Sequence, residues 1–302
     1  MIYPNFTILG PPKTGSTSLF NYLSQHTEIY ASPMKEPRFF LFDHDDPETR
    51  IKMQGLAKIL RWEMVWNMAQ YKGLFDGVKD EKAVGEGTVS YLAAPGTPQR
   101  LYDYNPDMKL IVVLRQPADR AYSHYAWRRT SAVEKAPTFS QALHEERTGL
   151  REDWYIAKYL PHGFYYKLLT DYLYVFPREQ ISIHLFEDFI DNPTETCRGL
   201  CTFLGVDPNF TPNVSKVWNI SGSFSNRLLQ RSWEKSLVLR DALRPYMPRG
   251  LRHQLYTTLT SHMTKTPFPP REREELTDYY RDDILQLQQL LGRDLTHWLE
   301  PE

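Results

Sequence analysis

The amino-acid sequence predicts an α/β protein whose single domain has a central, mostly parallel sheet flanked by helices. Short apolar runs alternate along the chain with longer segments that have apolar residues at helical spacing, the order typical of strands joined by helical crossovers. Two of the runs are almost purely apolar, as strands covered on both faces must be. No internal repeat is visible in the 302 residues. We therefore expect one domain over residues 1–302, with long insertions between the strands.

Three apolar runs are the predicted strands, and a helical segment follows each of them. The strands cover residues 5–10, 109–114 and 180–185, and the helices that follow them cover residues 17–26, 118–130 and 194–204. Further helices are predicted over residues 140–147, 163–175, 227–243 and 271–291.

The overall charge is nearly balanced, with 36 Lys and Arg against 37 Asp and Glu and a net charge of -1. Because no global basic field favours nucleic acid, we expect no nucleic-acid partner, and any anion must be bound by a local site. No apolar run approaches the roughly 18 residues of a membrane span, and the first run is too short for a signal peptide. The chain is therefore expected to be cytoplasmic, without a membrane span. The sequence does not indicate its oligomeric state.

No metal site is predicted. Cys197 and Cys201 lie four residues apart in a predicted helix, with both side chains on the face toward the core. A metal site needs more than two ligands, and cysteines at this spacing are poorly placed for a disulfide. The nine histidines show no HExxH or other ligand spacing.

Residues 10–19, GPPKTGSTSL, directly follow the first predicted strand. A tight Gly/Pro turn followed by Ser and Thr at a helix start is the layout of a loop that binds phosphate at a helix N-terminus. Measured against the nucleotide-binding pattern GxxxxGK[ST], Gly10 and Gly15 have the correct spacing. The residue after the second glycine is Ser16, however, and Lys13 lies ahead of that glycine. The loop is suited to phosphate, but its lysine is misplaced for ATP.

The second strand, KLIVVL, ends at Arg115, and the helix that begins near Pro117 carries Ser123. In an open α/β sheet, ligands bind outside the carboxyl ends of the strands, so Arg115 is expected in the same crevice as the 10–19 loop. A kinase or ATPase usually ends such a strand in an Asp that organises Mg²⁺. An Arg instead offers a fixed cation for a second phosphate. The alternative is that Arg115 forms a surface salt bridge.

Glu36 lies in the stretch ASPMKEPRFFLFD, residues 31–43, just ahead of the apolar run FFLF. Burial raises the pKa of a glutamate, which can then serve as a general base near neutral pH. The alternative is a solvated loop glutamate. The stretch VGEGTVSYL, residues 84–92, is uninformative by itself.

Together these stretches resemble the sulfotransferases that use 3'-phosphoadenosine 5'-phosphosulfate (PAPS), especially the branch similar to heparan sulfate and bacterial carbohydrate sulfotransferases. PKTGST resembles the family's loop for the 5'-phosphosulfate, and RQPADRAYSHY resembles its 3'-phosphate element, with Arg115 and Ser123 at the family's spacing. KEPRFF resembles KExHFF, whose glutamate is the catalytic base, and EGTVSY resembles the segment EKxxxY. HLFED (184–188) and the terminal LGRDLTHW are also similar to family segments, so the resemblance spans nearly the whole chain.

The resemblance implies the P-loop-like sulfotransferase fold, PAPS as co-substrate, 3',5'-adenosine bisphosphate as product and no metal. Lys13 would stabilise the oxygen that bridges sulfur and phosphorus as the sulfuryl group leaves, and Glu36 would take the acceptor's proton. The implied catalytic residues are thus Lys13 and Glu36. The implied co-substrate-binding residues are Lys13, Thr14, Gly15, Ser16, Thr17, Arg115 and Ser123.

Two positions on the acceptor side depart from the family pattern, because Arg38 replaces the histidine of KExHFF and Gly87 replaces the lysine of EKxxxY. The lost lysine argues against a polyanionic, heparan-like acceptor and for a small or neutral one. We expect sulfuryl transfer to a hydroxyl or amine of a carbohydrate or small-molecule natural product. Residues 216–227 are candidates for closing the nucleotide site. The alternatives are a P-loop small-molecule kinase, a glycosyltransferase with a DxD-like run at residues 43–45, and a non-catalytic binding module.

Overall fold

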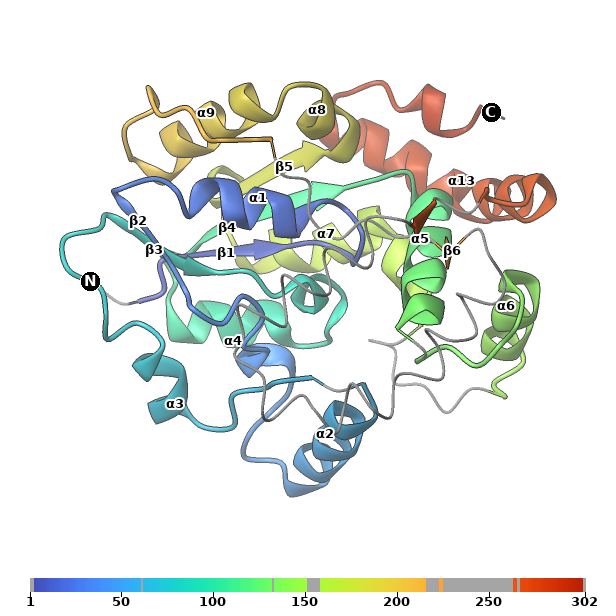
Figure 1. Ribbon diagram of the computed structural model, residues 1–302, viewed down its shortest axis with the longest axis horizontal. Coiled ribbons are helices and arrows are strands. Elements are labelled where there is room, and N and C mark those ends of the chain that lie inside the picture. Colours follow the sequence, from blue (N-terminus) through green and yellow to red (C-terminus); the bar gives the residue numbers. More distant parts are fainter. Residues whose placement is uncertain are drawn as a thin grey trace.

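The computed structural model describes residues 3–60, 62–131, 133–150, 158–215, 223–224, 263–264 and 267–300. Its centre is a five-stranded parallel sheet with the strand order β2-β3-β1-β4-β5 (Figure 1). The strands are β1 (Phe6–Leu9), β2 (Ile29–Ala31), β3 (Ala83–Glu86), β4 (Lys109–Leu114) and β5 (Ile181–Leu185). The predicted parallel sheet and its three predicted strands are confirmed. A short antiparallel pair, β6 (Ser223–Phe224) and β7 (Met263–Thr264), lies apart from this sheet.

The sequence analysis missed β2 and β3, which are only three and four residues long. In β3, AVGE, a glycine and a glutamate interrupt any apolar run. Gly85 is required there because the ring of Phe6, on the neighbouring β1, lies 2.5 Å from the position that a Cβ would occupy. Gly85, which makes β3 hard to recognise in the sequence, is therefore required by a contact with another strand.

In the described ranges, helices occupy connections between strands, and α13 follows the last strand. They are α1 (Ser16–Leu23), α2 (Pro47–Leu60), α3 (Met68–Gly73), α4 (Thr97–Tyr104), α5 (Pro117–Thr130), α6 (Phe139–Arg147), α7 (Tyr165–Val175), α8 (Phe186–Asp191), α9 (Pro193–Leu204) and α13 (Pro270–Leu291). Six of the seven predicted helices are confirmed, and the one predicted over residues 227–243 lies outside the described residues. None of the helices in the described ranges is long and apolar enough to cross a bilayer.

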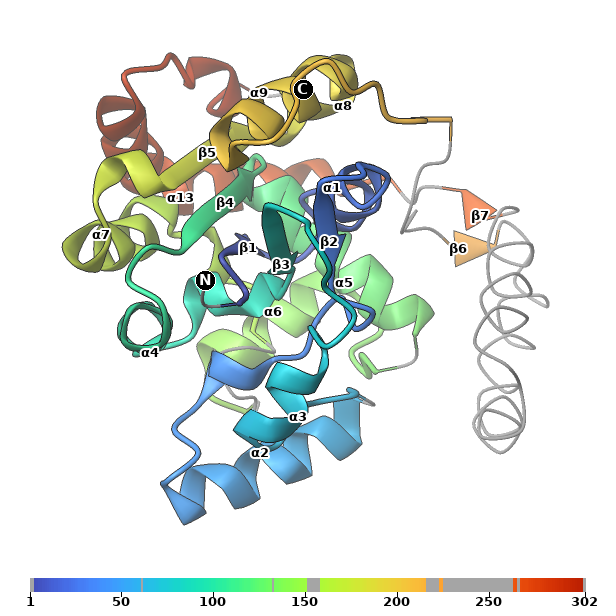
Figure 2. The ribbon, with the colours of Figure 1, turned by 90° about the vertical axis from the view of Figure 1, so that its left-hand side faces the viewer.

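Helices lie on both faces of the sheet (Figures 1 and 2). An apolar layer of buried side chains covers each face. Side chains alternate along β4, so Leu110, Val112 and Leu114 join one layer while Ile111 and Val113 join the other. The first layer includes residues of α4, α5, α7 and α13, and the second includes residues of α1 and α9. Because both faces of the sheet are covered, ligands have access to it chiefly at the ends of its strands.

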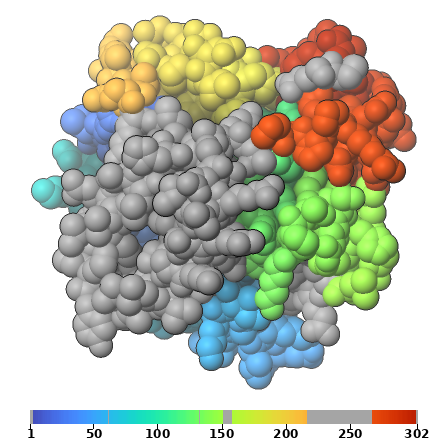
Figure 3. All heavy atoms as spheres, turned by 45° about the vertical axis from the view of Figure 1, so that its right-hand side comes forward, coloured from blue at the N-terminus to red at the C-terminus, as the bar shows by residue number. Residues whose placement is uncertain are grey.

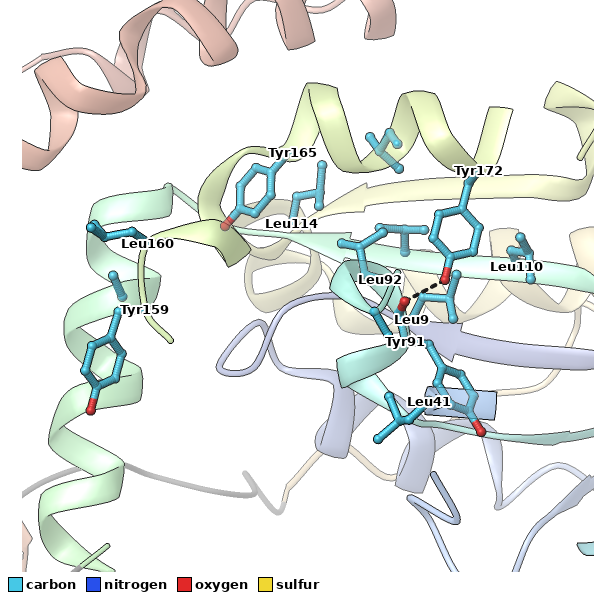
Figure 4. Packing of buried hydrophobic residues seen from close by; sticks show 14 of the residues in the cluster. Leu9, Leu41, Tyr91, Leu92, Leu110, Leu114, Tyr159, Leu160, Tyr165 and Tyr172 are labelled. Carbon is cyan, nitrogen blue, oxygen red and sulfur yellow. Dashed lines mark hydrogen bonds between the residues drawn. The ribbon is translucent and has the colours of Figure 1, made fainter. Parts of the chain in front are cut away.

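The first layer also fixes the elements that surround the carboxyl ends of the strands. Figure 4 shows Leu9 of β1 and Leu114 of β4 in this layer beside Tyr165 and Tyr172 of α7. The hydroxyl of Tyr172 donates a hydrogen bond to the backbone oxygen of Tyr91, at 2.7 Å. In the second layer Cys197 and Cys201 are buried free thiols on α9, as their spacing predicts.

Candidate active site

The loop between β1 and α1 lies at the carboxyl end of the central strand. Gly10 and Gly15 have positive φ angles, 139° and 82°, which favour glycine. A Cβ at Gly10 would lie 2.9 Å from the backbone oxygen of Val113 in β4, so the loop can approach this strand closely only with glycine there. The buried Thr14 hydroxyl donates to the backbone oxygen of Pro11, at 3.0 Å, and closes the loop on itself. Ser16 then begins α1, whose first-turn amides have no acceptor within the helix and suit an anion.

Lys13 has a left-handed backbone, with φ 78°, which is uncommon for a residue other than glycine. Its backbone oxygen accepts a hydrogen bond from Nη1 of Arg115, at 3.3 Å. Burial, and secondarily the positive charge of Arg115, lowers the pKa of Lys13 to about 7. The structure thus brings together the two cations that the sequence predicted to share a crevice. Two neighbouring cations with this shift form a site that a bound anion would stabilise.

Arg115 is held in place at the end of β4 by two aromatic residues. Its guanidinium carbon lies 4.8 Å from the centre of the Phe186 ring, and its backbone oxygen accepts from the hydroxyl of Tyr165, at 2.7 Å. Phe186 follows β5 directly and also lies 3.1 Å from the position that a Cβ would occupy on Gly15. Phe186 therefore contacts both parts of the predicted phosphate site, a role that the sequence analysis did not identify.

Ser123 lies about two turns into α5, a helix with a well-defined start. The helix begins with Pro117, and the side-chain oxygen of Gln116 accepts from the backbone N–H of Asp119, at 2.7 Å. Ser123 is partly exposed. In the described ranges, no hydrogen bond joins its hydroxyl to Arg115 or Lys13. Its predicted contact with the 3'-phosphate stays a prediction.

Glu36 lies between two cations. Its carboxylate contacts the Lys35 ammonium, with Oε1 at 3.2 Å from Nζ, and forms an ion pair with the Arg38 guanidinium. Burial acts to raise the pKa of Glu36, but Arg38 and Lys35 outweigh it, so the pKa lies below its ordinary value. The raised pKa that an apolar, desolvated setting alone would give is thus reversed here by the two cations. The aromatic residues that suggested an apolar setting, Phe39 and Phe40, point into the core, while the flanking cations turn back onto the carboxylate.

Arg38 anchors this turn through its side chain as well as its charge. Its backbone is left-handed, with φ 57°, and its guanidinium lies 4.5 Å from the ring centre of Trp62. Nη1 donates to the backbone oxygens of Glu36 and Glu63, at 3.0 and 3.1 Å. Arg38, which stands where the KExHFF pattern has a histidine, is thus the main partner of Glu36, the candidate base.

The EGTVSY segment supports the loop that carries Glu36, although its sequence alone was uninformative. The backbone N–H of Gly87 donates to the oxygen of Lys35, at 2.8 Å. Thr88 Oγ1 accepts from the N–H of Arg38, at 3.3 Å. The Tyr91 hydroxyl accepts from the N–H of Phe40, at 3.1 Å. Three successive contacts therefore fix the loop over the end of β3.

The two late segments that resemble family segments contact each other. Trp298 donates from Nε1 to Oε1 of Glu187, at 2.6 Å, and Arg293 forms an ion pair with Asp188. Figure 3 shows this C-terminal segment, in red, beside the yellow segment that includes α8. Because α8 begins with Phe186, the C-terminal segment supports the helix that positions the Phe186 ring against the guanidinium of Arg115.

The run at residues 43–45 is part of a turn before α2. Asp43 accepts from the backbone N–H of Asp45, at 2.9 Å, and Asp46 accepts from that of Glu48, at 3.1 Å. These carboxylates cap the turn and the helix start. Within the described part of the chain, no group of three or more His, Cys, Asp or Glu residues is arranged to hold a metal ion.

The parallel sheet flanked by helices, with a glycine-bounded loop after its central strand, defines an α/β protein of the P-loop-like class. The family model described as "Sulfotransferase domain" matches residues 4–290. The chain belongs to the sulfotransferase family.

Individual relatives agree with this assignment. The chain is 25% identical over 99% of its length to a mouse bifunctional heparan sulfate N-deacetylase/N-sulfotransferase 3, covering 31% of that protein. It is 30% identical over 70% of its length to human heparan sulfate glucosamine 3-O-sulfotransferase 3B1, covering 50% of that protein. The chain thus spans about a third to a half of these curated relatives. A crystal structure of a sulfotransferase from Alicyclobacillus acidocaldarius matches with a TM-score of 0.74 and 31% identity, over 99% of this chain and 100% of that one.

Proposed function

We propose that the protein transfers a sulfuryl group from PAPS to a hydroxyl or amine of a carbohydrate or small-molecule acceptor. The observation that carries the proposal is the Lys13–Arg115 pair at the 10–15 loop, because two adjacent, partly buried cations match a donor with anionic groups. Binding of such a donor restores the protonated state of Lys13, since a nearby negative charge raises the pKa of an ammonium.

On the donor side, the amides at the start of α1 and the hydroxyls of Ser16 and Thr17 hold the 5'-phosphate. Arg115 and Ser123 hold the 3'-phosphate, which distinguishes this donor from AMP-like nucleotides. Lys13 stabilises the bridging oxygen, on which negative charge grows as the S–O bond to phosphate breaks. No residue in this scheme calls for a divalent metal.

On the acceptor side, Glu36 removes the proton from the attacking hydroxyl or amine as the new bond to sulfur forms. The proton ends on the carboxylate, and 3',5'-adenosine bisphosphate leaves with the electron pair of the broken S–O bond. The lowered pKa keeps Glu36 ionised, so it is ready to accept a proton across the neutral range. Arg38 holds the carboxylate in one orientation.

The surroundings of Glu36 support the proposed acceptor class. Gly87 contributes no cation there, and the side chain of Lys35 passes 3.8 Å from the position of a Cβ on residue 87. The ammonium of Lys35 contacts Glu36, so it is engaged by the protein rather than held out for a polyanion. This arrangement supports a small or neutral acceptor.

The test is a transfer screen with labelled PAPS over sugars, amines, phenols and lipid headgroups, read by mass spectrometry for an added sulfuryl group. We expect transfer to at least one neutral class. Tight binding of 3',5'-adenosine bisphosphate without transfer to any class would instead favour a non-catalytic binding module.

A further inference from the structure

Glu86, the last residue of β3, is a buried carboxyl group that the proposed reaction does not use. Its side chain has no exposed surface. Oε2 accepts a hydrogen bond from Thr88 Oγ1, at 2.8 Å, whereas Oε1 has no hydrogen-bond partner among the described residues. Burial penalises the carboxylate form far more than the neutral acid, so this place favours the protonated carboxyl.

The titratable groups that face Glu86 are the hydroxyls of Tyr71 and Tyr91, the carboxylate of Glu36 and the ammonium of Lys35. Burial raises the pKa of Glu86 to about 8; Thr88 and Tyr91 oppose this shift, Glu36 adds to it, and Lys35 opposes it weakly. Burial also raises the pKa values of Tyr71 and Tyr91, and the nearby Glu86 adds to both. Glu36 and Glu86 thus divide the roles of a carboxylate pair, one ionised by its cations and the other protonated.

Hydrogen bonds connect Glu86 to the loop that carries Glu36. The single hydroxyl hydrogen of Thr88 points to Glu86, which leaves an oxygen lone pair for the N–H of Arg38. That N–H belongs to the left-handed residue at which the chain turns after Glu36. Glu86 therefore orients the group that fixes this turn.

We propose that Glu86 remains protonated in the active enzyme and positions the Glu36 loop through Thr88, and that its ionisation removes this support. The inference rests on the proposed role of Glu36 as base. Ionised Glu86 would attract the ammonium of Lys35, which contacts Glu36. Drawing Lys35 toward Glu86, or opening the site to water, displaces the loop.

The first experiment is the pH profile of kcat at saturating donor and acceptor, where the bound donor keeps Lys13 protonated. Wild-type kcat should fall as pH rises through about 8. Glu86→Gln, which keeps the shape and cannot ionise, should retain kcat near neutral pH and lose this alkaline decline. Glu86→Ala, which removes the partner of Thr88, should lower kcat by about tenfold with little change in donor KM.

The matched control is Asp283→Asn, because Asp283 is a second buried carboxyl with a pKa raised by burial. It accepts from the backbone N–H groups of Tyr166 and Lys167 at the start of α7. This variant should lose stability and keep the wild-type alkaline decline. An alkaline decline that persists in Glu86→Gln, or is lost equally in Asp283→Asn, overturns the proposal.

A second measurement needs no turnover. The δ-carboxyl resonance of Glu86 in ¹³C-glutamate-labelled protein, assigned by its absence from Glu86→Gln, should titrate near pH 8. Ionised Glu86 at pH 7 refutes the inference even if neither variant is active. Retained activity in Glu36→Gln refutes the base assignment instead, so the two failures are distinguishable.

Discussion

Replacing Lys13 with methionine should stabilise the protein below pH 7 and at the same time abolish most turnover. Burial and the neighbouring Arg115 lower the pKa of Lys13 from 10.5 to about 7. A lowering of this size corresponds to at most about 5 kcal/mol of folding free energy for the partly buried ammonium. Methionine has a similar length and carries no charge.

The sign of the pH dependence follows from the direction of this shift. Between about pH 7 and pH 10.5, the unfolded chain binds more protons at this residue than the folded protein does. The cost is complete below pH 7 and fades as pH rises toward 10.5. Wild-type unfolding free energy should therefore rise over this window relative to that of Lys13→Met.

The assay is urea unfolding of both proteins at several pH values, with and without 3',5'-adenosine bisphosphate. The ligand should protect the wild type more than the variant, because its phosphates relieve the cost of the ammonium. Lys72→Met, on the exposed surface of α3, is the control and should change stability by less than about 0.5 kcal/mol. If Lys13→Met is less stable than wild type at pH 6 and the ligand protects both equally, the reasoning is refuted.

Three further predictions concern the chemistry. Glu36→Gln should lower kcat by about 10² to 10⁴-fold while donor binding persists. In the wild-type pH profile of kcat, the decline at acid pH should lie below pH 4.5, because the pKa of Glu36 is lowered. A decline near neutral pH would contradict the ion pairs around Glu36. Calorimetry on the wild type should show 3',5'-adenosine bisphosphate binding at least about a hundredfold more tightly than AMP, and Arg115→Ala should remove most of this difference in affinity. Equal wild-type affinities for the two ligands would remove the reason for naming PAPS as the donor. Turnover should continue in excess EDTA. If EDTA abolished turnover and added Mg²⁺ restored it, the kinase alternative would be favoured.

Parts of the fold could be predicted because their signals are local. β1, β4 and β5 are apolar runs bounded by turns, and Lys13 and Arg115 stand at recognisable positions beside two of them. β3 has no such signal, because Gly85 is set by the ring of Phe6, which is far away in the sequence. Its pairing with β1 becomes apparent only in the folded structure.

In the candidate site, too, some features could be predicted from local sequence and others depend on tertiary contacts. The position of Glu36 follows from its motif, but its pKa depends on how the side chains of Lys35 and Arg38 fold back, and an apolar flank predicts the opposite sign. The importance of Thr88 likewise depends on a hydrogen bond to the backbone of Arg38, fifty residues earlier in the chain. Residue types predict which groups are available, whereas tertiary contacts decide their charge state and orientation.

The ring of Phe186 makes residues 15 and 115 depend on each other over evolutionary time. It packs against both Gly15 and the guanidinium of Arg115, so a side chain added at position 15 would crowd the ring that contacts the cation. A change at either position therefore alters which changes the other tolerates, and the two cannot drift independently. Directed evolution of donor preference in this enzyme should accordingly vary positions 15, 115 and 186 in one combined library, because single-site libraries sample only the combinations that the present ring allows.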